Sequence, residues 1–356
     1  MAYRYRLIDL FAGCGGMTRG FVDTGDYEPV FAVENDPDAA RTYELNFGRH
    51  VARLAGGRLA TIEEVDRFPE ADVIVGGPPC QGFSPLNMRA TGLERRELWF
   101  DYVRAIADVQ PLAFVMENVP ELLRSAEYAA FREAVAVLDL GYRIIDDVLN
   151  AADYGVPQTR RRAIVIGSRV GSPEIPVPTH HDPRNPEPGR SPWRDFRFAV
   201  RGLPRVPDGR NWHNPRNPQQ KSVDRYRTIP NEGEGRFELA ARRPDITPNC
   251  WLNKKTGTTD VFGRLWWDRP AYTIRTEFYK PEKGRYLHPS EHRPITVREA
   301  ARCMSFPDDF QLPIDQSMTS VARQVGNAVP PLLASRIASA VTQVLGTDAR
   351  LEELAA

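Results

Sequence analysis

The stretch LIDLFAGCGG, residues 7–16, decides the fold of this 356-residue chain. An apolar run at residues 7–11 leads directly into a glycine-rich turn, which is typical of a buried parallel strand followed by a helix. Glycines in such a turn let the backbone approach a ligand closely at the start of the helix. The dinucleotide fingerprint G-x-G-x-x-G would require a glycine at Thr18, so the pattern disfavours a nicotinamide cofactor.

The same pattern of apolar run, turn and helical segment recurs along the first half of the chain. Further apolar runs lie at 30–33, 72–75, 112–116 and 163–166, and helical periodicity lies at 36–47, 98–109 and 126–138. Strands that alternate with helices predict the α/β class, here a Rossmann-like, doubly wound, mostly parallel sheet.

Two helices are predicted in the last sixty residues of the chain. One covers 296–305, where Thr296 as a cap and Glu299 three positions later match a capping box. The other covers 331–345 and has prolines at its first turn, which helices tolerate.

Composition describes an ordinary globular chain. Lys and Arg together number 47, as do Asp and Glu, and no run reaches the ~18 consecutive apolar residues of a membrane span. The start of the chain shows no basic segment followed by an apolar one, so we expect no membrane partner and a cytoplasmic location. The four cysteines are too far apart for a disulfide framework or a metal clip; Cys250 and Cys303 are expected to be packing residues.

Residues 180–293 form a basic segment in an otherwise acidic chain, with 23 basic and 14 acidic side chains. The segment is rich in Pro, Gly and Arg, which predicts irregular backbone. Composition alone fits a solvated loop region, although a basic segment is also what a nucleic-acid partner requires. Trp251, Trp266 and Trp267 are expected in the core of this region, because tryptophan is seldom left exposed.

Functional side chains follow the predicted strands, at the edge where open α/β sheets bind ligands. Glu34 follows the second run, where a carboxylate can accept hydrogen bonds from both hydroxyls of a ribose. Alternatively, it is a solvated carboxylate at the end of a strand. Cys80 follows the third run, at the tip of a loop stiffened by two prolines, although a lone cysteine is more often a small buried residue. Glu117 follows the fourth run, where a carboxyl group can exchange a proton with a substrate or cap the next helix.

Three arginines, residues 160–162, precede the run at 163–166. Strand alternation would place Arg160 and Arg162 on one face, so that both guanidinium groups converge on an anionic or carbonyl-rich substrate. The alternative is an edge strand protected by charge.

Seven motifs, in order, resemble those of DNA (cytosine-5) methyltransferases: LIDLFAGCGG, the Glu34 site, GGPPCQGFS, MENV, QTRRR, RPITVREAARCMSFPDDF and QVGNAVP. The resemblance covers nearly the whole chain except roughly 180–262. It implies a class I methyltransferase fold whose last helix packs against the first. It further implies a catalytic and S-adenosylmethionine-binding domain at 1–178, a small target-recognition domain at 179–323, and a segment at 324–356 that returns to the catalytic domain.

The resemblance also implies the reaction, which is sequence-specific methylation of DNA cytosine at C5. Cys80 would add to C6 of a flipped-out cytosine and make C5 nucleophilic. Glu117 would bind the N3 and amine edge of the base, while Arg162, together with Arg160, would hold the base and the thiolate loop. S-adenosylmethionine would supply the methyl group and leave as S-adenosylhomocysteine, and no metal is expected.

Binding residues follow from the same resemblance. Cofactor contacts are implied at Phe11, Gly13, Gly15, Gly16, Glu34, Asn35, Ile62, Pro79, Leu98, Asn327 and Val329, and Cys14 would be a small side chain beside the cofactor. DNA contacts are implied at Gln81, Ser84, Arg89, Thr273 and Ile274. The expected partners are double-stranded DNA and a cognate restriction endonuclease, with the enzyme acting as a monomer.

Two other functions stay open at this point. An RNA cytosine methyltransferase could use the same scaffold, but its tRNA-methylating members carry a Cys-Phe-Thr segment that this sequence lacks. A catalytically idle DNA-binding module would require neither Cys80 nor Glu117 nor Arg162.

Overall fold

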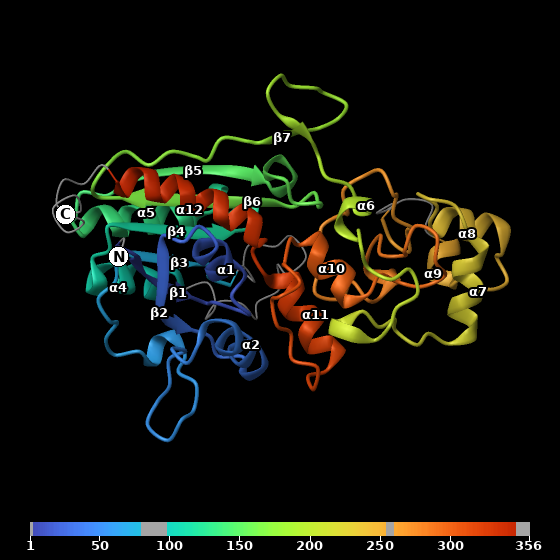
Figure 1. The fold of residues 1–356 in the computed structure, drawn as a ribbon, viewed down its shortest axis with the longest axis horizontal. Helices are drawn as coiled ribbons and strands as arrows, with labels where there is room; N and C mark the ends of the chain where they lie inside the picture. The colour runs from blue at the N-terminus through green and yellow to red at the C-terminus, as the bar shows by residue number, and fades with distance from the viewer. Residues whose placement is uncertain (1–2, 80–97, 254–259, 347–356) are drawn as a thin grey trace. The chain divides into compact units, whose positions relative to one another are not determined.

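The computed structural model describes residues 3–79, 98–253 and 260–346. The chain forms two compact units (Figure 1). The sheet unit contains Met1–Tyr154, Arg161–Thr179 and Ala328–Ala356, and the second unit contains Gly155–Arg160 and His180–Asn327. The functional domains predicted at 1–178, 179–323 and 324–356 stay predictions.

A six-stranded sheet in the order β2-β1-β3-β4-β6-β5 forms the centre of the sheet unit. Its strands are β1 (Tyr5–Leu10), β2 (Tyr27–Val33), β3 (Val73–Gly76), β4 (Ala113–Asn118), β5 (Arg143–Asn150) and β6 (Arg161–Ser168). Strands β1 to β4 pair in parallel, and β6 is antiparallel to both β4 and β5. The predicted α/β class with a mostly parallel sheet is confirmed, and the strand order reverses beside β1, where such sheets bind ligands.

Most helices of the sheet unit lie where periodicity predicts them. They are α1 (Gly16–Val22), α2 (Pro37–Phe47), α4 (Leu98–Val109), α5 (Ala126–Val137) and α12 (Pro331–Leu345), with short 3-10 helices η1 (Ile62–Glu64), η3 (Pro120–Arg124) and η4 (Ala151–Tyr154). Asp36 caps the start of helix α2, and its side chain accepts from the backbone N–H groups of Asp38 and Ala39.

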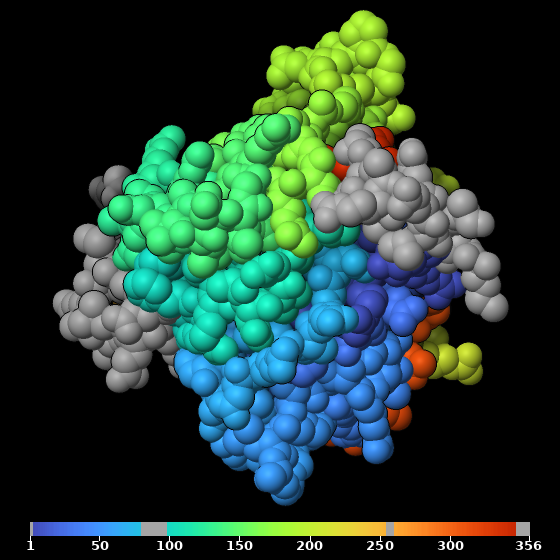
Figure 2. Space-filling model, turned by 90° about the vertical axis from the view of Figure 1, so that its left-hand side faces the viewer, coloured from blue at the N-terminus to red at the C-terminus, as the bar shows by residue number. Residues whose placement is uncertain are grey.

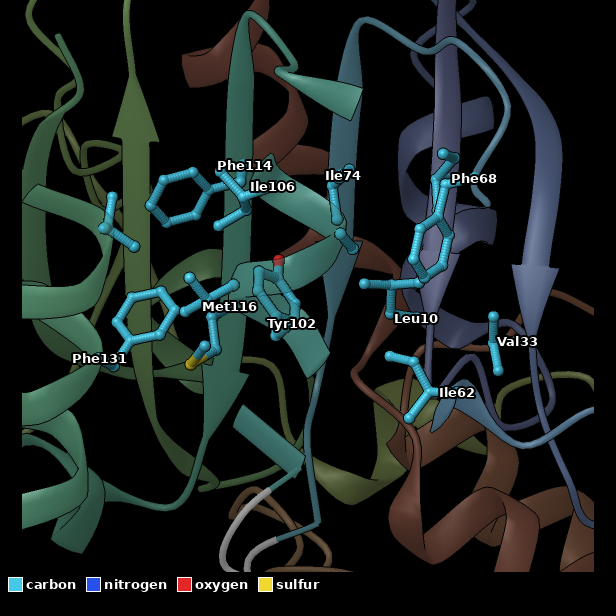
Figure 3. Packing of buried hydrophobic residues seen from close by; sticks show 14 of the residues in the cluster. Leu10, Val33, Ile62, Phe68, Ile74, Tyr102, Ile106, Phe114, Met116 and Phe131 are labelled. Carbon is cyan, nitrogen blue, oxygen red and sulfur yellow. The ribbon is translucent and has the colours of Figure 1, made fainter. Parts of the chain in front are cut away.

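The main apolar core of the sheet unit joins the strands to α4 and α5 (Figure 3). Its buried side chains include Leu10, Ile74, Phe114 and Met116 of the sheet, Tyr102 and Ile106 of α4, and Phe131 of α5. The buried Tyr102 hydroxyl donates to the carbonyl of Val115 at 2.7 Å, which satisfies the one polar group of this ring. In Figure 2, residues of the α4 and α5 region (blue-green) cover one side of this unit, above the segment that precedes β3 (blue).

Helix α12 packs against α1, as the resemblance implied. The closest approach is at Gly20, where a Cβ atom would lie 2.3 Å from the carbonyl oxygen of Pro331 and 2.4 Å from Cβ of Ala334. The hydroxyl of Tyr27 donates to the carbonyl of Ala338 at 3.0 Å, which ties α12 to β2 as well.

We expect Gly20→Ala to destabilise the protein by about 2 kcal/mol, because the added methyl group must displace backbone atoms of α12. Urea unfolding followed by circular dichroism measures this change. Gly346→Ala is a matched control, since Gly346 has φ −64° and an added Cβ there meets its nearest atom at 3.4 Å. Equal free energies of unfolding for the two variants would contradict this account of the helix contact.

The second unit consists of short helices and irregular segments, as predicted for the stretch from 180 to 290. Its elements are α6 (Phe196–Ala199), α7 (Gln220–Thr228), α8 (Arg236–Arg242), α9 (Asn249–Leu252), α10 (Val297–Cys303), α11 (Met318–Asn327), η5 (Arg210–Trp212), η6 (Pro281–Lys283) and the strand pair β7 (His180–His181) and β8 (Ser191–Pro192). Helix α10 starts with the predicted capping box of Thr296 and Glu299.

Packing in the second unit corrects one prediction. Trp251 packs against a small apolar core around Phe262, and Cys303 is fully buried. Cys250 is exposed, so the prediction that it is a packing residue is wrong. It lies in α9, a helix of four residues none of which is fully buried.

The stretch Met318–Leu345 contains α11 and α12. Judged by its length and composition alone, it could span a membrane. However, 61% of the relevant window is buried inside the protein. Core helices of globular proteins have the same properties, so this stretch is weak evidence for a membrane span.

Candidate active site

The turn between β1 and α1 depends on residues with left-handed backbone. Phe11, Gly13 and Gly15 have φ of 59°, 56° and 89°. A Cβ atom at Gly15 would lie 2.3 Å from the Phe47 ring, so packing requires glycine there. A Cβ atom at Gly13 would meet nothing within 4 Å, so this side of the turn leaves space in which a ligand can approach the backbone.

Glu34 holds this turn in place from the end of β2. Its Oε2 accepts from the Gly13 N–H at 2.8 Å, and its Oε1 accepts from the Asp36 N–H at 2.7 Å. Burial raises the pKa of Glu34, and these backbone donors oppose the rise. Because each carboxylate oxygen offers two acceptor sites, Glu34 can hold the turn and still accept a ribose hydroxyl. The turn and the carboxylate together therefore fit an adenosine-containing ligand such as S-adenosylmethionine.

A buried polar network lies behind the turn. The Thr18 hydroxyl donates to Oδ2 of Asp9 at 2.5 Å and lies 3.3 Å from the Tyr43 hydroxyl. Asp9 is 2% exposed, and burial raises its pKa to about 7. Sequence reasoning assigned no role to Asp9, because a single aspartate inside an apolar strand carries no distinctive pattern.

We expect the wild-type protein to lose stability as the pH rises from about 4 to 7, and we expect Asp9→Asn to abolish this loss. The folded pKa of Asp9, about 7, lies above the unfolded value of about 4, so the folded protein binds more protons in this range and its stability falls as pH rises. Asparagine keeps the acceptor for Thr18 but does not ionise. Free energies of urea unfolding at pH 5 and pH 8 test this, and an identical pH dependence in both proteins would contradict it.

Glu117 lies at the end of β4, beside the start of the GGPPC loop. A Cβ atom at Gly77 would lie 3.2 Å from Oε2 of Glu117. The side-chain amide of Asn118 donates to the carbonyl of Pro78 at 2.9 Å and so ties the loop to β4. Sequence reasoning assigned no role to Asn118, although its place in the MENV motif was an available signal.

Arg162 of β6 forms an ion pair with Glu117. Its Nε lies 2.8 Å from Oε1 of Glu117, and the two side chains are 16% and 10% exposed. Charges interact more strongly in such surroundings than in water. The arginine thus orients the carboxyl group, whose second oxygen lies next to Gly77 and the beginning of the loop.

Arg160 has different partners. It is 2% exposed and donates from Nη1 to the carbonyl of Ile274 at 3.0 Å and from Nη2 to that of Gly326 at 3.1 Å, within the second unit. The described contacts of Arg160 are thus with main-chain carbonyls, and its convergence with Arg162 on one substrate stays a prediction. Strand alternation does not apply, because Arg160 precedes β6 and belongs to the segment in which Gln158 pairs with Ala271.

The other predicted site residues are distributed as follows. Cys80, Gln81, Ser84 and Arg89 lie outside the described residues, and Pro79 directly precedes them. In the sheet unit Gly16 begins α1, Asn35 is exposed, Ile62 and Val329 are buried, and Leu98 begins α4. In the second unit Thr273 is half-buried, Ile274 is buried, and Asn327 is exposed at the end of α11. Among the described residues, no three His, Cys, Asp or Glu side chains are grouped to hold a metal ion.

Known proteins similar to this chain are methyltransferases. Residues 5–343 match the family described as C-5 cytosine-specific DNA methylase. Type II methyltransferase M1.HphI of Haemophilus parahaemolyticus is 32% identical over 350 residues, which cover 95% of this chain and 86% of that protein. Type II methyltransferase M.XorII of Xanthomonas oryzae pv. oryzae is 32% identical over 372 residues, which cover 95% of this chain and 84% of that protein.

Solved structures share the fold. A putative DNA modification methyltransferase encoded within an E. coli prophage aligns with a TM-score of 0.67 and 23% identity, over 96% of this chain and 99% of that one. The S. pombe Dnmt2 methyltransferase aligns with a TM-score of 0.65 and 17% identity, over 96% of this chain and all of that one. Because the family match extends over nearly the entire sequence, this chain belongs to the C-5 cytosine-specific DNA methylase family.

Proposed function

We propose that this C5 cytosine-specific DNA methyltransferase acts on a particular duplex sequence through a covalent bond between Cys80 and a flipped-out cytosine. The observation that carries the proposal is the ion pair between Glu117 and Arg162, which holds a carboxyl group beside the loop leading to Cys80. A module that only binds DNA has no use for this arrangement.

The chemistry of cytosine explains why a thiol and a carboxyl group are needed together. C5 is too electron-poor to take a methyl group directly, so the Cys80 thiolate adds to C6 and makes C5 nucleophilic. Glu117 binds the N3 and amine edge of the base and assists protonation there, while Arg162 keeps the carboxyl group oriented. C5 takes the methyl group and loses its proton, and expulsion of Cys80 restores the aromatic ring.

S-adenosylmethionine, when bound, supplies the methyl group from its sulfonium sulfur. We assign its adenosine part to the glycine turn and Glu34, because the open side of Gly13 and the half-buried carboxylate suit a nucleoside. We also propose that S-adenosylmethionine contacts the other residues that the sequence resemblance implies, which are Phe11, Gly15, Gly16, Asn35, Ile62, Pro79, Leu98, Asn327 and Val329.

DNA binding is assigned to the second unit together with Gln81, Ser84 and Arg89. Flipping the target base out of the stack costs a few kcal/mol, and the basic surplus of residues 180–293 supports phosphate contacts that offset this cost.

Because the relatives are named Type II methyltransferases, we also propose that the enzyme works in a restriction-modification system, together with an endonuclease that recognises the same DNA site. The enzyme would act as a monomer in the cytoplasm.

Transfer of labelled methyl groups from S-adenosylmethionine to duplex DNA and to tRNA tests the substrate. We expect label in duplex DNA only, and label in tRNA alone would favour the RNA methyltransferase.

Bisulfite sequencing of DNA from a host that expresses the chain identifies the target sequence. Duplexes with 5-fluorocytosine at that target should form a stable protein adduct, because fluorine cannot leave as the C5 proton does. Methylation of ordinary DNA without such an adduct would contradict the covalent step.

A further inference from the structure

We propose that Gln158 and Arg160 are positioning residues for DNA recognition, which hold the main chain at Thr273 and Ile274 rather than the target base. This inference rests on the proposed function, since it assumes that Thr273 and Ile274 lie at the DNA. Its basis is a group of hydrogen bonds within the second unit that join residues 158–160 to residues 271–274, to Cys303 and to Gly326.

Gln158 binds the N–H of Ile274. The side chain is fully buried, and its Oε1 accepts from the Ile274 N–H at 2.7 Å, while its Nε2 donates to the carbonyl of Cys303 at 3.3 Å. Only the amide oxygen can accept from an N–H group, so these two partners fix the orientation of the carboxamide. Loss of this oxygen would leave a buried N–H without its acceptor.

Arg160 binds the carbonyl of the same residue. Its two terminal nitrogens donate to Ile274 and to Gly326, which belongs to α11. Burying a guanidinium group is costly unless hydrogen bonds satisfy it, and a rigid planar fork suits two fixed carbonyl acceptors. A Cβ atom at Gly326 would lie 2.5 Å from the carbonyl carbon of Arg275, so α11 packs directly on the main chain that follows Ile274.

The flanking residues are held by the same segment. The Thr159 N–H donates to the carbonyl of Ala271 at 2.9 Å, and the Thr273 hydroxyl donates to the carbonyl of Thr159 at 2.9 Å. Ala271 and Ile274 are fully buried, whereas Tyr272 and Arg275 are exposed. The hydrogen bonds from residues 158–160, which we call the clamp, therefore fix the main chain of 271–275 with Tyr272 and Arg275 facing outward.

This arrangement separates the roles of two neighbouring arginines. Reading bases requires donors and acceptors held in fixed positions, which a clamped main chain supplies. Arg160 holds the recognition segment, and Arg162, two residues further along, orients the carboxyl group of Glu117. Variants of the two arginines should consequently differ in the kinetic parameter that they change.

The test uses the full-length enzyme with Gln158→Met, Arg160→Lys, Arg162→Lys and Arg161→Ala. Each variant is assayed on its target duplex and on a duplex with one base pair changed. We expect Gln158→Met and Arg160→Lys to lower the ratio of kcat/KM between the two duplexes by about tenfold, mainly through a higher KM for the target. Arg162→Lys should lower kcat and leave that ratio unchanged. Arg161 is exposed, so Arg161→Ala serves as the matched control and should behave as the wild type.

A fall in kcat for Arg160→Lys with an unchanged ratio would overturn the proposal and make Arg160 a catalytic residue. Should Arg160→Lys fail to fold, Gln158→Met decides the question through hydrogen exchange of the peptide covering 271–276. We expect faster exchange there than in the wild type, and unchanged exchange would also overturn the proposal. A wild-type enzyme that methylates no DNA would instead refute the proposed function.

Discussion

Cys80→Ser is expected to abolish methyl transfer while DNA binding stays close to that of the wild type. A serine hydroxyl is un-ionised at neutral pH and is a far weaker nucleophile than a thiolate, so addition to C6 fails. Because C5 cannot react without that addition, we expect kcat to fall by about 10⁴-fold or more. Single-turnover transfer of labelled methyl groups and a gel-shift titration with target DNA measure the two effects separately.

Cys250→Ser is the matched control for Cys80→Ser, because it makes the same chemical change at an exposed cysteine of the second unit that has no proposed role. It should keep full activity and still form the adduct with 5-fluorocytosine DNA, whereas Cys80→Ser should form none. Full methylation by Cys80→Ser would reject the covalent mechanism.

Local signals account for the parts of the fold that could be predicted. The strands β3 and β4 are apolar runs that end in glycine or polar residues, and β1 is an apolar run shortly before a glycine-rich turn. The capping box of α10 and the proline-led helix starts depend on neighbouring residues only. Strand β5 could not be predicted, because RIIDDVLN carries charges among its apolar residues and buries only Leu149 fully. Its conformation depends on pairing with β6, which is a tertiary interaction.

The same distinction divides the site residues. Glu34 and Glu117 could be singled out because the carboxyl ends of the parallel strands lie at one edge of the sheet. The hydrogen-bond partners of Arg160 lie 114 and 166 residues away along the chain, so no local pattern distinguishes it from Arg162. Motif membership indicated that both arginines matter, and only the tertiary contacts indicate what each of them holds.

Glu117→Gln is expected to lower kcat by about 10²-fold to 10⁴-fold with little change in KM for DNA. Glutamine keeps the size and shape of the side chain, but it cannot deliver a proton to N3 of cytosine. It also removes the negative charge that lies 2.8 Å from Nε of Arg162, whose side chain is 16% exposed. Steady-state kinetics on target DNA, with adduct formation on 5-fluorocytosine DNA as a second measurement, test both consequences.

Glu121→Gln is the matched control, because Glu121 is exposed in η3, four residues from Glu117. We expect it to leave kcat unchanged.

The adduct measurement then shows which step Glu117→Gln slows. Slow adduct formation means that the carboxyl group acts while Cys80 adds to C6, because N3 must gain its proton as C5 becomes nucleophilic. An unchanged kcat with a raised KM would instead show that Glu117 binds the base equally well before and during the reaction, which would contradict its proposed role in protonation.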